Sequence, residues 1–201
     1  MSVIEPITCA VWQPATPIEV VEWLAPLAEP WWIAGGWALD LFLGEMTRPH
    51  NDIDVGIFRR DALSACATLL EWECFEARAG TLTLLDMGAA PQAAVNSLWC
   101  RRRGQMKWAF ELMLDEGGLD RWNYRRDERI WRSFEFAIHR SRGGIPYIAP
   151  EIQLLYKSKT VRAKDQTDFE RVVGRLNLDA RTWLRASIAA LHPNHVWLSK
   201  L

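Results

Sequence analysis

The sequence predicts an α/β (α+β) protein: a short mixed β-sheet flanked by helices, followed by a mainly helical C-terminal portion. Short apolar runs typical of buried strands alternate with segments of helical spacing in the first 125 residues. After about residue 125 helical spacing dominates. The chain has 201 residues, 49% hydrophobic and 24% charged, as expected of a globular protein. We therefore expect a core in residues 1–125 and a mainly helical portion packed on it in residues 126–201.

The first elements show helix, strand and helix signals in turn. Thr16-Pro17 predicts a helix start, because threonine is a good N-cap and proline suits the first helical position. Residues 31–34 form a short apolar run that stops at Gly35-Gly36, which indicates a buried strand entering a tight turn. Helical spacing resumes in residues 37–43. A helix, a strand and a second helix are therefore expected before residue 44.

The later elements are predicted in the same way. Gly44 is the expected C-cap of the second helix. Apolar, strand-like runs predict strands at residues 52–58, 75–79, 82–85, 97–100 and 107–114. Apolar residues at helical spacing predict helices at residues 62–72, from Pro150 onward, and at 168–176 and 182–191.

Bulk properties argue against several classes of protein. With 24 basic and 25 acidic residues, the chain has no overall field to attract nucleic acid. No apolar run approaches the ~20 residues of a membrane-spanning helix, and no signal peptide is visible. The four cysteines lack metal-ligand spacing and indicate reduced thiols. The 12 tryptophans are expected mostly in the core, with some available to stack on an adenine or a sugar. We expect a cytoplasmic protein without a membrane or nucleic-acid partner.

The most informative segment is Asp52-Ile53-Asp54, at the start of a predicted strand. Residues two apart on a strand project from the same face, so Asp52 and Asp54 would present two carboxylates together while Ile53 points into the core. Two adjacent carboxylates repel each other unless a cation lies between them. Mg²⁺ is such a cation, and it prefers oxygen ligands. A solvated strand end is the alternative interpretation of this motif taken alone.

The glycine pair fits the same site. A Gly35-Gly36 turn at a helix start lets backbone N–H groups approach a phosphate with no Cβ in the way. Carboxylates on one side of a metal and a triphosphate on the other form a site for phosphoryl or nucleotidyl transfer. The order of strand, Gly-Gly, helix, loop and strand is more specific than either motif alone.

The segment also resembles a known family. The residues Gly35-Gly36-Trp37-Ala38-Leu39-Asp40, Leu43-Gly44, Thr47-Arg48, His50 and Asp52-Ile53-Asp54-Val55 resemble the signature of the aminoglycoside adenylyltransferases and lincosamide nucleotidyltransferases. These enzymes belong to the polymerase-β-like nucleotidyltransferase superfamily. The resemblance implies the nucleotidyltransferase fold, two Mg²⁺ ions held by Asp52 and Asp54, and in-line attack of an acceptor hydroxyl on the α-phosphorus with pyrophosphate leaving.

The resemblance also implies a third carboxylate on a neighbouring strand. Glu111 is the best match, as metal ligand or general base, although the family more usually has aspartate there. Asp115 is the rival, and a turn residue is its simpler explanation. Which of the two completes the site stays open at this point.

Two residues just before Asp52 are candidates through the same resemblance. Arg48 would contact phosphate, and His50 would orient a carboxylate or the acceptor. A solvated loop in which both support local structure is the alternative. Asp40 is expected as an exposed helix residue rather than a group behind the site.

Basic residues in the C-terminal portion are further candidates. Lys157 could reach the β- or γ-phosphate, and Lys159 is a weaker candidate. The alternative for both is a solvated helix end. Asp165 as a helix N-cap with Asp168 in the first turn explains that pair without any ligand.

The function expected from these residues is Mg²⁺-dependent transfer of AMP from ATP, or of another nucleoside monophosphate, to a hydroxyl of a small molecule. Through the resemblance, an aminoglycoside or lincosamide antibiotic is a possible acceptor. Nucleotidyl transfer to a protein or RNA, or a binding module that has lost activity, are the alternatives. Near-neutral charge disfavours RNA.

Overall fold

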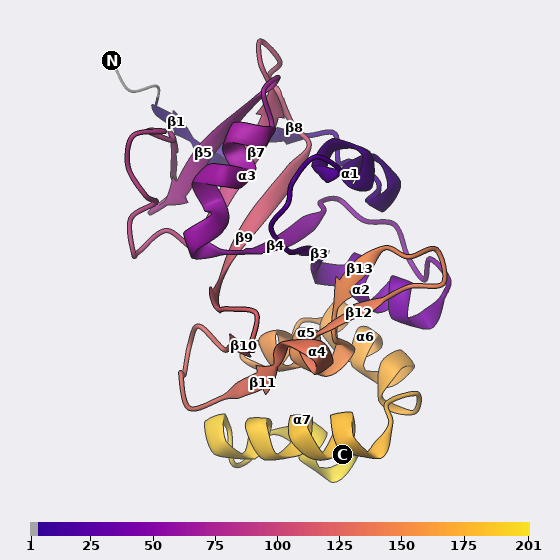
Figure 1. Ribbon diagram of the computed structural model, residues 1–201. Helices are drawn as coiled ribbons and strands as arrows, with labels where there is room; N and C mark the ends of the chain where they lie inside the picture. Colours follow the sequence, from indigo (N-terminus) through magenta and orange to yellow (C-terminus); the bar gives the residue numbers. More distant parts are fainter. Residues whose placement is uncertain (1–3) are drawn as a thin grey trace.

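The computed structural model describes residues 4–201, which Figure 1 shows coloured along the chain. The strands are β1 Ile4–Pro6, β2 Val11–Trp12, β3 Trp31–Ile33, β4 Asp54–Phe58, β5 Trp72–Arg78, β6 Thr81–Leu84, β7 Ser97–Arg102, β8 Lys107–Trp108, β9 Phe110–Gly117, β10 Arg121–Asn123, β11 Trp131–Ser133, β12 Ile138–Arg140 and β13 Pro146–Ile148. The α-helices are α1 Pro17–Leu24, α2 Gly35–Leu43, α3 Ala62–Thr68, α4 Phe134–Ala137, α5 Pro150–Ser158, α6 Ala163–Val173 and α7 Leu178–Leu191. Short 3-10 turns lie at Ile7–Cys9, Arg59–Asp61 and Val196–Ser199.

The main sheet is mixed, as predicted. Its strands run in the order β1-β6-β5-β7-β9-β4-β3-β13-β12, and β10 with β11 branches from β9. The pairs β4 with β9 and β3 with β13 are parallel, while the other pairs are antiparallel. Strand β4, which opens with Asp54, therefore lies near the middle of the sheet, between β3 and β9.

Local capping explains where the first two helices begin and end. The Thr16 hydroxyl accepts a hydrogen bond from the Glu19 N–H, the Glu19 carboxylate binds the Thr16 N–H, and Pro17 opens α1. Helix α2 ends at Gly44, whose φ of +80° is the left-handed conformation that glycine adopts readily. Both predictions are confirmed.

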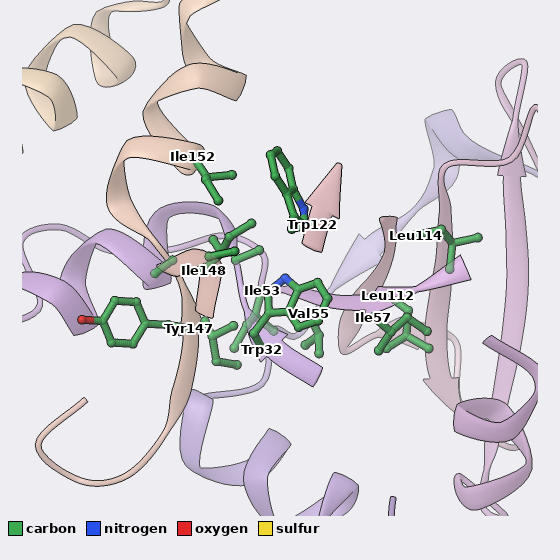
Figure 2. Close-up of a cluster of buried hydrophobic side chains, with 14 of the residues drawn as sticks. Trp32, Ile53, Val55, Ile57, Leu112, Leu114, Trp122, Tyr147, Ile148 and Ile152 are labelled. Carbon is green, nitrogen blue, oxygen red and sulfur yellow. The ribbon is translucent and has the colours of Figure 1, made fainter. Parts of the chain in front are cut away.

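The core lies between the sheet and the helices that cover it. Figure 2 shows Trp32, Ile53 and Val55 packed with apolar side chains from β9, β13 and α5. Trp32 is fully buried against Gly56, where any Cβ would overlap the indole ring. Burial of such side chains contributes about 1.5–3 kcal/mol each. This packing holds β4, and with it Asp54, in a fixed position.

Strands from the second half of the chain complete the sheet. β13 pairs in parallel with β3, and β12 pairs with β13. Helices α5, α6 and α7 gather below this end of the sheet in Figure 1, where α5 contacts both α6 and α7. The C-terminal portion thus contributes strands as well as helices, and the division at residue 125 stays a prediction.

Several predicted boundaries differ from the structure. The helix expected at residues 62–72 ends at Thr68, because Trp72 already begins β5 and packs against Trp23. The strand expected at residues 107–114 is interrupted at Ala109, whose carbonyl accepts the Ala15 N–H. Helix α6 begins at Ala163, before the predicted residue 168, and α7 begins at Leu178, before residue 182. Within residues 4–201, every helix is too short or too polar to cross a membrane.

Candidate active site

The two aspartates of the DxD motif line one cavity of about 520 Å³. β4 begins at Asp54, so Asp52 lies just before the strand rather than within it. Ile53 between them is completely buried, as predicted. The side chains on either side of Ile53 are thereby directed into the cavity.

Glu111 is the register partner of Asp54 on the parallel strand β9. Residues directly paired in neighbouring strands project from the same face, which brings Glu111 beside Asp54. Asp115 lies four residues further along β9, opposite Phe58. Its carboxylate lines the cavity and accepts a hydrogen bond from the Tyr156 hydroxyl at 3.2 Å. The two candidates for the third carboxylate thus differ in position: Glu111 lies beside Asp54 but is not among the lining residues of the cavity, whereas Asp115 lines it further along β9.

The surroundings of these carboxyl groups raise their pKa values. Burial, followed by the negative charges of Glu111 and Asp52, raises the pKa of Asp54 to about 8. Burial also raises the pKa of Glu111, against hydrogen bonds from Ser97 and Trp99 that lower it. The pKa of Asp115 is raised to about 6 by burial, again partly offset by hydrogen bonds. A nearby cation would favour the ionised form of each group.

The glycine pair has a steric role that the structure makes explicit. Gly35 has φ +63°, and a Cβ on it would overlap Oδ2 of Asp54. A Cβ on Gly36 would overlap the Arg48 guanidinium and lie 2.6 Å from Cε1 of His50. The Gly35 N–H, expected to face a phosphate, instead donates to Oε1 of Gln153 at 2.9 Å. The pair therefore makes room for Asp54, Arg48 and His50, and Gln153 fixes the turn to α5.

Asp40 is buried rather than exposed, which corrects the prediction. Its carboxylate binds Nε2 of His50 at 2.6 Å and the Thr47 hydroxyl at 2.7 Å. Arg48 contacts Nδ1 of His50 at 3.3 Å, and arginine can only donate. Nδ1 is therefore the acceptor, and the imidazole hydrogen lies on Nε2, directed at Asp40. Trp37 stacks on the ring at 4.3 Å.

His50 consequently lies behind the cavity wall and not in it. Its side chain is only 3% exposed, both ring nitrogens are engaged, and it is absent from the cavity lining. This placement leaves His50 no contact with an acceptor. Its contacts hold the loop that leads into Asp52.

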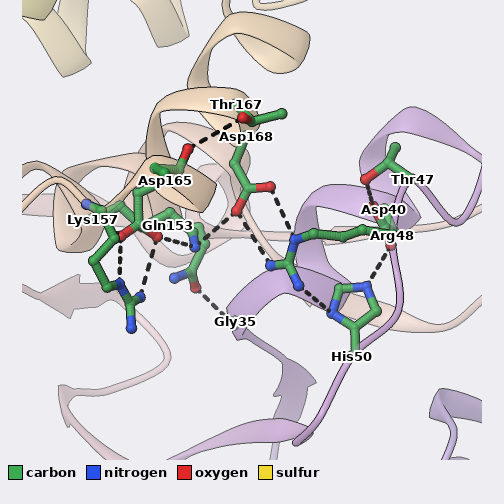
Figure 3. A network of polar contacts seen from close by, with 12 residues as sticks. Gly35, Asp40, Thr47, Arg48, His50, Gln153, Lys157, Asp165, Thr167 and Asp168 are labelled. Atoms are coloured by element: carbon green, nitrogen blue, oxygen red, sulfur yellow. Dashed lines mark hydrogen bonds and ion pairs between the residues drawn. The ribbon is translucent and has the colours of Figure 1, made fainter.

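Lys157 and Arg48 share the carboxylate of Asp168, as Figure 3 shows. Lys157 Nζ lies 2.8 Å from Asp165 and 3.0 Å from Asp168, while Arg48 reaches Asp168 at 3.3 Å. Asp165 and Asp168 are buried. Despite burial, the bonds from Arg162 and Lys157 lower the pKa of Asp165. The two aspartates therefore do more than cap α6: they join α5, α6 and the loop before β4.

Basic side chains outnumber acidic ones in the cavity lining. Lys159 and Lys164 are exposed at its rim, beside Arg162, which binds Asp165. The charged lining residues are Arg48, Arg125, Arg126, Lys157, Lys159, Arg162 and Lys164 against Asp52, Asp54, Asp115 and Asp165. A cavity lined by carboxylates and by a larger number of cations suits a metal-bound polyphosphate.

The donor set fits Mg²⁺ that a nucleotide helps to bind. Among residues 4–201, no three His, Cys, Asp or Glu side chains form a metal cage of their own. Mg²⁺ commonly takes one or two carboxylates and completes its shell with water and substrate phosphates. Asp52 and Asp54 would be these carboxylates, since both line the cavity.

Comparison with known proteins agrees with this geometry. A family model described as aminoglycoside-2''-adenylyltransferase matches residues 18–82. Two 2''-aminoglycoside nucleotidyltransferases, from Escherichia coli and Klebsiella pneumoniae, are each 49% identical over 43 residues. That match covers 20% of this chain and 24% of each relative, so the chain spans about a quarter of the length of these curated relatives.

Solved structures resemble the chain over most of its length. The lincomycin-bound lincosamide antibiotic adenylyltransferase LnuA matches with a TM-score of 0.53 and 14% identity, over 77% of this chain and 92% of LnuA. ANT(2'')-Ia in complex with adenylyl-2''-tobramycin matches with a TM-score of 0.53 and 13% identity, over 87% and 95% of the two chains. The fold is that of a nucleotidyltransferase. The family model and the curated relatives match a part of the chain, and the solved structures share its fold.

The nucleotidyltransferase fold also brings in residues that sequence reasoning missed. Gln153 holds Gly35, and Tyr156 binds Asp115. Arg125 and Arg126 line the cavity from the segment after β10. No tryptophan of the described chain lines this cavity, where the aromatic ring is that of Tyr156. Only the helical face of α5 gave a signal for Gln153 and Tyr156, and no local pattern marks the two arginines.

Proposed function

We propose that this chain is a Mg²⁺-dependent nucleotidyltransferase that moves a nucleoside monophosphate, AMP from ATP, onto a hydroxyl of a small molecule and releases pyrophosphate. The observation that carries the proposal is that Asp52 and Asp54 line a cavity with a basic rim, with Glu111 as the register partner of Asp54 on β9. The relatives that support an enzyme are antibiotic nucleotidyltransferases, so antibiotics are the first acceptors to test.

The residues have separate tasks in this proposal. Asp52 and Asp54 would hold Mg²⁺, which when bound neutralises charge on the phosphates. Glu111 accepts the proton of the acceptor hydroxyl as its oxygen forms a bond to the α-phosphorus. The bond from the α-phosphorus to the oxygen that bridges the α- and β-phosphates breaks, and pyrophosphate leaves with that oxygen. Lys159 and Lys164 lie at the cavity rim, where they would bind the β- and γ-phosphates.

Pyrophosphate release tests the proposal directly. The chain would be incubated with each of the four nucleoside triphosphates, Mg²⁺, and a panel of aminoglycosides, lincosamides and hydroxylated metabolites. We expect acceptor-dependent release that disappears in Asp54→Asn. Mg²⁺-dependent nucleotide binding with no release for any acceptor would instead favour a binding module or a macromolecular acceptor.

A matched pair of variants identifies the third carboxylate. Glu111→Gln removes the group beside Asp54 and should lower kcat by about 10²–10⁴-fold, the usual contribution of a general base. Asp115→Asn retains the shape of the cavity wall and should lower kcat less. The reverse order of the two effects would transfer the role to Asp115.

A further inference from the structure

The cavity has two chemically different walls. The N-terminus of α2 and the segment from α5 to α6 form one wall, with Gly36, Lys159 and Lys164. Strand β9 and the segment after β10 form the other, with Asp115, Arg125 and Arg126 in its lining. Tyr156 of α5 lies against this second wall, because its hydroxyl binds Asp115. Arg126 donates to the Tyr156 carbonyl, so the two walls meet at Tyr156.

The first wall suits the triphosphate. Within residues 4–201, Lys159 and Lys164 have no carboxylate within ion-pair distance, in contrast to the neighbouring Lys157 and Arg162. Their charges remain available for the phosphates. The α2 N-terminus adds the favourable end of a helix dipole on the same side.

The acceptor must then lie against the second wall. Its hydroxyl has to reach a carboxylate on β9, whether Glu111 or Asp115, to lose its proton. The side chains it meets there come from β9 and from Arg125 and Arg126. This step rests on the proposed function, since it assumes that a hydroxyl is activated at this site.

The lining of the second wall has two arginines and one carboxylate. Asp115 supplies its carboxylate, one oxygen of which already accepts the Tyr156 hydroxyl. The guanidinium groups of Arg125 and Arg126 lie 5.4 Å and 5.2 Å from the centre of the Tyr156 ring. In the part of the chain that the structure describes, their hydrogen bonds go to the Asn96 and Tyr156 carbonyls and the Tyr124 hydroxyl, and neither forms an ion pair.

We propose that the acceptor is an anionic hydroxylated small molecule whose carboxylate or phosphate binds Arg125 and Arg126. Guanidinium groups match the geometry of both anions and bind them bidentately. A polycation of the aminoglycoside type would instead place several ammonium groups beside two guanidinium groups, where Asp115 is the one carboxylate of β9 in the lining and Glu111 lies further along the strand. The relatives show that this fold can accept antibiotics, and the charge on this wall directs this chain to a different acceptor class.

Calorimetric titration of the chain tests the inference. The protein is first saturated with Mg²⁺ and a non-hydrolysable α,β-methylene analogue of ATP, so that the analogue occupies the first wall. Inorganic phosphate, malonate and tobramycin are then titrated separately. We expect phosphate or malonate to bind, and to bind about ten-fold more weakly in both Arg126→Ala and Arg125→Gln, because each loses a charge-assisted contact. Whichever anion binds more tightly identifies the phosphate or carboxylate class.

Arg129→Ala is the matched control. Arg129 lies on the same segment, binds Asp127, is 80% exposed and does not line the cavity, so its removal should leave anion binding unchanged. Three results would overturn the inference: tight binding of tobramycin, no binding of either anion, or anion binding whose affinity is unchanged in both Arg125→Gln and Arg126→Ala. Failure at the loading step, where the analogue does not bind in a Mg²⁺-dependent way, would instead contradict the proposed function.

Discussion

At the scale of single residues, Asp54 is costly to ionise in the absence of a cation. Its pKa is raised to about 8, so its contribution to stability is complete below its ordinary pKa and is lost as the pH rises towards 8. In EDTA at pH 9, we expect Asp54→Asn to be more stable than the unmodified chain by about 1–3 kcal/mol, and the difference to vanish near pH 4. Thermal unfolding across this pH range measures the difference. A stability gap that does not change with pH would contradict the assigned burial and charge repulsion.

At the scale of elements, helix α2 has a left-handed glycine at each end, and only one of them faces the site. Gly35 has φ +63° and would overlap Asp54 if it carried a Cβ, whereas Gly44 has φ +80° with open space around it. Both alanine substitutions should cost about 1 kcal/mol of backbone strain. Gly35→Ala should in addition displace Asp54 and abolish pyrophosphate release, while Gly44→Ala retains it. Urea unfolding and the release assay, run on both variants, separate strain from function; equal activity in the two would show that the close approach at Gly35 is unimportant.

At the scale of the whole molecule, the network of Arg48, Lys157, Asp165 and Asp168 connects the two halves of the chain. Because β13 also pairs with β3, we expect a single cooperative unfolding transition. Asp168→Asn should lower the free energy of unfolding by about 3–5 kcal/mol, because it removes the negative charge that pairs with Arg48 and with the buried Lys157. Glu170→Gln on the same helix removes an exposed pair with Lys200 and should change stability little. Calorimetry that resolves two transitions would argue for independent halves.

Much of the site was predictable because its signals are local. The N-cap at Thr16, the turn at Gly35 and the buried Ile53 each depend on residues a few positions apart. Asp40 shows the limit of such reasoning. Helical spacing left it on an apparently exposed face, but the loop that carries His50 folds back over that face and buries it.

The sequence by itself determined the strand that carries Asp54, the glycine pair at the start of α2 and the mixed α/β character, because short-range sterics and hydrophobic periodicity decide these features. Only the tertiary structure decided which carboxylate lies beside Asp54, since that depends on the register of β4 against the distant strand β9. It also decided that Lys157 is held between two buried aspartates, and that Arg125 and Arg126 line the cavity. These are long-range pairings, and their energies arise only when segments far apart in the sequence pack together.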